Sequence, residues 1–176
     1  MTIDRATFPL PDTRDPLVAP FFAAAARSEL RIPRCEMCER FVWYPTELCA
    51  ACNGALQWTS MSGRGTLFTW VVVQRAFLPA FESMVPFVTA LIALVEDPAV
   101  RLCSYLVDAT PEALRADAAV EVAFRPLSFT TVRDVSVVVP MFTLAGSKPP
   151  GARASASGGT AEPPGARAPA SGGTGA

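Results

Sequence analysis

The chain has 176 residues, of which 51% are hydrophobic and 18% charged, enough for one ordinary domain or two small modules with a real core. Its 15 basic and 16 acidic side chains give a net charge of −1, unlike the basic excess of a general nucleic-acid binder. Histidine is absent, which excludes Ser-His and Cys-His catalytic pairs and mixed Cys/His metal sites within this chain.

The hydropathy pattern predicts no membrane span, because no run of about 20 apolar residues occurs. The first residues lack the charged-then-apolar layout of a signal peptide, so we expect a cytoplasmic location. Thiols stay reduced in the cytoplasm, and this favours metal binding over disulfides.

The N-terminal part, residues 1–29, is predicted to be an arm followed by a helix. Residues 1–14 are rich in proline and charge and predict an extended arm. Asp15 then offers a helix cap followed by proline, and apolar residues continue at helical spacing to about Arg27. Phe21 and Phe22 cannot both face one core, so one of them is expected to meet a neighbour.

Residues 30–60 are predicted to form a zinc ribbon, because they hold two Cys-x-x-Cys pairs separated by ten residues. Each pair lets one tight turn present two sulfurs to a single ion, and two such turns supply the four thiolates of a tetrahedral zinc site. The expected ligands are Cys35, Cys38, Cys49 and Cys52. A closed four-thiolate set leaves no position for water, so Zn²⁺ is expected to be structural. Iron in the same cage, as in a rubredoxin, is the alternative.

Residues 61–146 are predicted to form a five-stranded barrel, so the fold class is mostly β. The expected strands are 66–74, 87–95, 100–107, 120–125 and 135–139, the last ending at Pro140. A short helix is predicted from Thr110 to about Arg115, between the third and fourth strands. Five strands with a helix inserted there suit an OB-type barrel, with a plain β-sandwich as the alternative.

The third predicted strand carries the fifth cysteine, Cys103. A nucleophilic role would need a base, and no histidine is present to activate the thiol. A buried or half-buried strand residue is the favoured interpretation.

The C-terminal segment, residues 147–176, is predicted to be a disordered, flexible tail. It contains a tandem repeat of 14 residues, PPGARASASGGTAE at 149–162 and PPGARAPASGGTGA at 163–176. The repeat holds no valine, leucine, isoleucine or aromatic residue. Ordering it would cost roughly 1–2 kcal/mol per residue with nothing to bury in return.

The order of helix, four-cysteine ribbon and five-stranded barrel resembles the DUF35 family, whose members join a rubredoxin-like zinc ribbon to an OB fold and associate with acyl-CoA enzymes. The resemblance covers about residues 16–145. The stretches that carry it, besides the cysteine pairs, are 20–24, 30–35, 62–69, 85–88, 106–115 and 120–125. The chain departs from the family pattern at Glu39, where a glycine often follows the first cysteine pair.

The resemblance implies a non-catalytic accessory subunit that binds a thiolase-like or lipid-transfer-type enzyme, an aldolase or thiolase, in a hetero-oligomer and helps to hold acyl-CoA. A hot-dog-fold enoyl-CoA hydratase is the alternative partner. The residues agree on one point, because no catalytic set can be assembled from them. Carboxylates such as Glu82, Glu96 and Asp97 have neither a base nor an open metal site beside them and are interpreted as solvated loop charge.

A CoA contact needs cations for phosphates and an apolar or aromatic slot. The loop at 76–86 is apolar with few charges, which is typical of an interface, a pocket or a cover on the barrel mouth. The expected acyl-CoA or partner contacts are Phe21, Phe22, Arg64, Arg75, Phe77 and Phe81. A nucleic-acid-binding ribbon and OB fold is a third possibility, disfavoured by the near-zero charge and the single lysine, Lys148.

Overall fold

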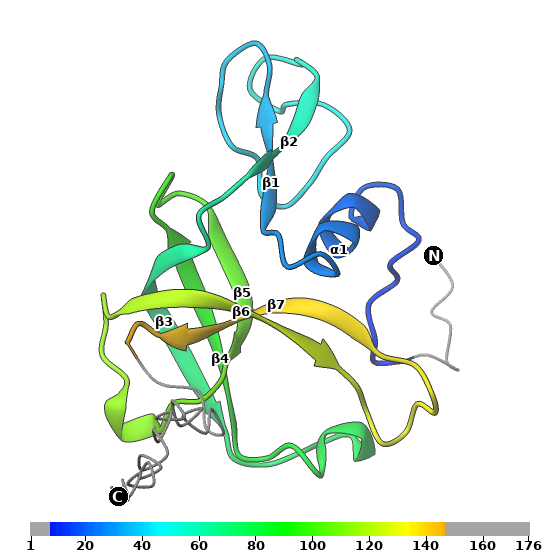
Figure 1. The fold of residues 1–176 in the computed structure, drawn as a ribbon, viewed down its shortest axis with the longest axis vertical. Coiled ribbons are helices and arrows are strands. Elements are labelled where there is room, and N and C mark those ends of the chain that lie inside the picture. Colours follow the sequence, from blue (N-terminus) through cyan, green and yellow to red (C-terminus); the bar gives the residue numbers. More distant parts are fainter. Residues whose placement is uncertain (1–7, 147–176) are drawn as a thin grey trace, which may run out of the picture.

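The computed structural model describes residues 8–146, and its element order is helix, two-stranded ribbon, then barrel (Figure 1). The mostly β fold predicted from sequence is confirmed in this part of the chain. The first seven residues of the predicted arm and the predicted tail at 147–176 lie outside the described residues. Across 8–146, no helix is long and apolar enough to cross a membrane.

The N-terminal helix α1, Ala19–Ala25, is shorter than the sequence predicts. Asp15 accepts a hydrogen bond from the Leu17 amide (2.9 Å), which fixes a turn ahead of the helix. The far end stops because Ser28 adopts a left-handed conformation (φ 59°), and the Glu29 amide donates back to the Ala24 carbonyl (3.0 Å), a Schellman-type stop. The helix packs against one ribbon strand and the last barrel strand.

The ribbon consists of β1 (Arg31–Cys35) and β2 (Leu56–Ser60), paired antiparallel with Pro33 opposite Trp58. It projects from the barrel at the top of Figure 1. Its base is part of the main core, because Leu30, Ile32 and Met61 are buried in the same cluster as the barrel interior. The ribbon is therefore attached to the barrel by packing as well as by the chain.

The barrel is closed, with strand order β3-β4-β5-β7-β6. Its strands are β3 (Arg64–Val73), β4 (Phe87–Leu94), β5 (Arg101–Leu106), β6 (Ala119–Leu127) and β7 (Val137–Leu144). Neighbours pair antiparallel except β5 and β7, which run parallel where Leu106 meets Phe142. This closed Greek key confirms the OB-type prediction, and the β-sandwich alternative is wrong.

Two barrel details differ from the sequence prediction. The helix expected after Thr110 is one 3₁₀ turn, η2 (Pro111–Ala113), which ends as Leu114 turns inward and becomes buried. The last strand does not stop at Pro140 but runs through it. Pro140 is tolerated because β7 pairs with β5 only locally, and the Pro140 carbonyl accepts a hydrogen bond from the Ser104 hydroxyl (2.6 Å).

A second, smaller cluster lies outside the barrel interior. It joins the β3–β4 loop, through Ala80 and Phe81, to the β6–β7 loop, through Phe129 and Val132. The β3–β4 loop carries a 3₁₀ turn, η1 (Pro79–Phe81), whose last two residues, Ala80 and Phe81, belong to this cluster. The two loops therefore hold each other against the barrel wall.

Candidate functional site

The first cysteine pair forms a tight turn at the end of β1. The Cys35 amide donates to the Arg40 carbonyl (2.9 Å), and the Glu39 amide donates to the Cys35 carbonyl (3.0 Å). The second pair repeats the arrangement, because the Cys49 amide donates to the Gly54 carbonyl (3.0 Å) and the Asn53 amide to the Cys49 carbonyl (2.7 Å). Two equivalent turns thus present one sulfur pair each.

The residue after each pair has a left-handed backbone, with φ 61° at Glu39 and 57° at Asn53. Glycine and asparagine adopt this region readily, which accounts for the glycine that the family resemblance leads us to expect at the first position. Here Arg34 supports the glutamate, since its guanidinium lies 2.9 Å from the Glu39 carboxylate and also donates to the Glu39 carbonyl (2.9 Å). The departure at Glu39 therefore leaves the turn intact.

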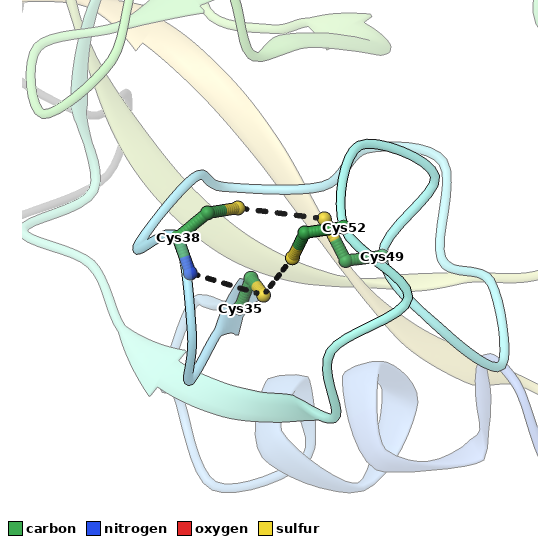
Figure 2. Close-up of side chains that lie close together, drawn as sticks. All are labelled: Cys35, Cys38, Cys49 and Cys52. Carbon is green, nitrogen blue, oxygen red and sulfur yellow. Dashed lines mark hydrogen bonds between the residues drawn. The ribbon is translucent and has the colours of Figure 1, made fainter.

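The four sulfurs converge on one point between the two turns (Figure 2). All lie within 4.8 Å of one another, with Cys35 to Cys52 at 3.4 Å and Cys38 to Cys49 at 3.6 Å. A tetrahedral zinc with 2.3 Å bonds separates its sulfurs by roughly 3.7 Å, so this set fits the ion. Four thiolates leave no position for water, and the site is a structural zinc site, as the sequence predicts.

Electrostatics at the sulfurs favour a cation. The Cys38 amide, 3.5 Å from the Cys35 sulfur, lowers the pKa of that thiol to about 6. At Cys52 the Gly54 amide lowers the pKa, but the neighbouring Cys35, Cys38 and Cys49 sulfurs and burial together raise it more, and the pKa reaches about 12. Four adjacent sulfurs cannot all ionise without a compensating charge, which a divalent metal supplies.

Gly54 leaves room for the Cys35 sulfur, so Gly54→Ala is expected to weaken zinc binding roughly 10–100-fold, as changes beside metal ligands do. An added Cβ would lie 2.8 Å from that sulfur and 3.0 Å from Cγ of Met37. Competition with a chromogenic zinc chelator measures the affinity. Ala55→Ser, at the exposed next position, is the control and should keep wild-type affinity. Equal affinities in both variants would contradict this account of Gly54.

An apolar cavity of about 310 Å³ lies where arm, helix, ribbon and barrel meet. Its lining carries no charged side chain. The lining residues are Pro9, Pro11, Val18, Phe21, Phe22, Trp43, Tyr44, Leu102, Cys103, Ser104, Tyr105, Leu127, Val139 and Pro140. The sequence predicts a contact role only for Phe21 and Phe22 among these residues, because the lining positions are scattered from 9 to 140, although the adjacent ribbon aromatics Trp43 and Tyr44 were a visible signal.

The six residues expected to contact acyl-CoA or a partner do not form one site. Phe21 is buried and Phe22 half-buried, and both line the cavity. Arg64 begins β3 and Arg75 lies two residues beyond its end, so at 3.3 Å per residue they are separated by roughly 36 Å of extended chain. Arg64 and Arg75 therefore lie at opposite ends of β3, and a contact of either one with acyl-CoA or a partner stays a prediction.

The two phenylalanines of the β3–β4 loop differ in how far they are exposed to solvent. Phe81 packs into the second cluster, with ring centroids 5.1 Å from Phe129 and 6.0 Å from Phe87. Phe77 is 90% exposed. Phe81 thus covers the barrel, while Phe77 stays available for a contact outside the chain.

The surface with which OB folds bind oligonucleotides is partly covered in this protein. That surface is the face of the second and third barrel strands with the loops after the first and fourth. Here those strands are β4 and β5, and their aromatics Phe87 and Tyr105 contact each other (5.6 Å) beneath Phe81 and Phe129. The rings of Phe87 and Tyr105 thus pack against other aromatics of the chain and are not free to stack on bases, which argues against the nucleic-acid alternative, although Phe77 on the β3–β4 loop stays exposed.

Other polar groups of the barrel have structural roles. Glu96 accepts a hydrogen bond from the Ser62 amide (2.6 Å), and Asp97 from the Ala99 amide (2.9 Å), so both carboxylates fasten turns. Cys103 is exposed on the outer face of β5, contrary to the burial expected from sequence. The reason is that β5 alternates, with Leu102 and Leu106 taking the inward positions.

Two consecutive family models match the chain. Residues 22–59 match the ChsH2 rubredoxin-like zinc ribbon domain, and residues 58–125 match the ChsH2 C-terminal OB-fold domain. A search of curated proteins found no match.

Two solved structures are similar to the chain. One is described as "Ltp2-ChsH2(DUF35) aldolase", at 26% identity and a TM-score of 0.65 over 77% of this chain and 99% of the other. The second is a DUF35 protein of unknown function from Sulfolobus solfataricus, at 11% identity and a TM-score of 0.50, over 76% and 88% of the two chains. The second likeness concerns the fold alone.

Proposed function

Because the chain belongs to the DUF35 family, with the ChsH2-type zinc ribbon and OB fold in order, we propose that it is a non-catalytic accessory subunit of an aldolase-type acyl-CoA enzyme. The observation that carries the proposal is the similarity to a chain described as part of an Ltp2-ChsH2(DUF35) aldolase. The match extends over 99% of that chain, so the likeness concerns the whole relative.

The chemistry of the chain supports an accessory role. The one group of metal ligands found among residues 8–146 is closed, and the sequence contains no histidine to serve as a base. The reacting groups then belong to the partner, which we propose is a thiolase-like or lipid-transfer-type subunit. A hot-dog-fold hydratase is the second candidate partner. The similarity to the chain described as "Ltp2-ChsH2(DUF35) aldolase" favours an aldolase over a hydratase.

Co-expression with the enzymes encoded beside this chain tests the proposal. The tagged chain is expected to co-purify with a thiolase-like subunit, and omitting the chain should lower the turnover of acyl-CoA substrates by that subunit. A chain that stays alone and changes no acyl-CoA activity would contradict the proposal. Co-purification with a hydratase instead would favour the second partner.

We further propose that the apolar cavity holds part of the acyl group. A pocket near 300 Å³ lined by aromatic and aliphatic side chains suits a small apolar ligand. The lining carries no cation for a phosphate, and the Ser104 hydroxyl is already bonded to the Pro140 carbonyl. The cavity therefore suits the neutral acyl chain, and the CoA phosphates would be held elsewhere.

Alkylation of Cys103 tests this second proposal directly, because the Cys103 thiol is exposed and lines the cavity. In the zinc-loaded complex, octanoyl-CoA is expected to slow alkylation of Cys103 by iodoacetamide at least about tenfold, measured by peptide mass spectrometry. CoA without an acyl chain is the control and should protect little. Equal protection by the two compounds, or none by either, would contradict an acyl site in this cavity.

A further inference from the structure

The loop at 74–86, which joins β3 to β4, is anchored at its second half. Ala80 is buried, and the Phe81 ring packs edge-on against Phe129 and stacks on Phe87. Backbone hydrogen bonds close the segment, since the Met84 amide donates to the Phe81 carbonyl (3.0 Å) and the Phe81 amide to the Leu78 carbonyl (3.0 Å). This half of the loop is held against the barrel by its own side chains.

The first half of the loop ends in two exposed apolar residues. Phe77 is 90% exposed and Leu78 45% exposed, immediately ahead of the η1 turn at Pro79. Because the turn is fixed by Ala80 and Phe81, the preceding residues stand away from the barrel at a defined place. Apolar side chains presented on an anchored loop are typical of a binding surface.

We infer that Phe77 is the anchor by which this chain docks on its enzyme subunit. The inference rests on the proposed function, which supplies the partner. Aromatic and arginine side chains dominate the binding energy of protein interfaces, and Arg75 is exposed two positions away. Among residues 8–146 the structure records no ion pair of Arg75. The partner surface that fits is an apolar recess for the phenyl ring with a carboxylate beside it for the guanidinium.

Charge favours an enzyme subunit over a second copy of this chain. A two-fold dimer brings the same patch of each copy together, so Phe77 meeting Phe77 would also bring Arg75 close to Arg75. Like charges facing each other across an interface oppose association, whereas an acidic rim on a different protein complements the arginine.

Phe77→Ala tests the inference in the complex obtained by co-expression. Its affinity for the enzyme subunit is expected to fall at least about 30-fold, the effect of losing an interface anchor. The melting temperature of the free chain should stay the same, because the ring contacts solvent. Phe68→Ala is the matched control. Phe68 is an exposed phenylalanine on β3, whose ring carries the Arg101 guanidinium (3.7 Å), and its removal should leave the affinity unchanged.

Each outcome decides the inference. Wild-type affinity in Phe77→Ala would overturn the anchor and leave the proposed function standing, since the complex would still form. Failure of the unchanged chain to bind any acyl-CoA enzyme would overturn both. A self-associated free chain that becomes monomeric in Phe77→Ala, seen by light scattering, would assign the ring to a second copy and also overturn the inference.

Discussion

Replacing Cys49 with serine is expected to release zinc and unfold the ribbon, the largest effect of any single substitution considered for this chain. Cys49 is buried, and its sulfur lies 3.6 Å from that of Cys38 in the four-sulfur cluster. Structural zinc in small ribbons contributes roughly 10–16 kcal/mol of apparent binding energy at pH 7, and this energy drives folding. Two five-residue strands cannot supply a comparable amount from their own packing.

The consequences of losing zinc should reach the cavity but not the whole barrel. The Trp43 ring lies 5.1 Å from that of Phe21, and both line the cavity with Tyr44. Unfolding of the ribbon removes this wall, so tryptophan fluorescence should shift to the red on metal loss. The barrel strands pair only with one another and should keep their circular dichroism signal.

Metal analysis of the unchanged protein and of two cysteine variants checks the zinc prediction. The unchanged protein should bind one zinc per chain, and Cys49→Ser should bind none stably. Cys103→Ser is the matched control, because Cys103 lies on β5 outside the cluster and its loss should leave the zinc content at one. A Cys49→Ser protein with full zinc content and unchanged fluorescence would contradict the structural role. Iron in the purified protein would restore the rubredoxin-like alternative.

The sequence predicted the features that depend on local spacing. The cysteine pairs could be assigned to one metal because two intervening residues force a tight turn, whatever the rest of the chain does. The strand at 100–107 could be assigned with its faces, because alternation reports burial directly, and Val100, Leu102 and Leu106 are indeed buried.

The features that the sequence missed depend on where distant segments meet. The sequence predicts that the two arginines lie near one loop, whereas residues 65–74, nine of them in the extended strand β3, separate them in the structure. Phe77 and Phe81 were indistinguishable in the sequence, since their difference comes from Phe129, which lies far along the chain and packs against only one of them. The sequence predicts a strand end at Pro140, because the residue pattern cannot show that β5 pairs with β7 only locally and does not need an amide donor at position 140.

The glycines that precede and open β3 belong to the stretch that resembles the family, and Gly65 has a clear physical reason. It lies at the seam of the barrel, where β3 pairs with Leu94 of β4 on one side and Val120 of β6 on the other. A Cβ on Gly65 would lie 2.6 Å from the Ala93 carbonyl oxygen and 2.7 Å from the Ile92 side chain. The carbonyl belongs to the neighbouring strand and cannot withdraw without breaking the seam.

Gly65→Val is therefore expected to destabilise the protein by about 3 kcal/mol or more, at the upper end of overpacking effects. Urea unfolding followed by circular dichroism measures the change. Gly146→Val is the control, because its Cβ would meet nothing within 4 Å and only its left-handed backbone (φ 79°) opposes the change, at roughly 1–2 kcal/mol. Similar losses of unfolding free energy in the two variants would mean that the strands around Gly65 shift to accommodate a side chain there. A much larger loss at Gly65 would identify barrel closure as the reason for a glycine there.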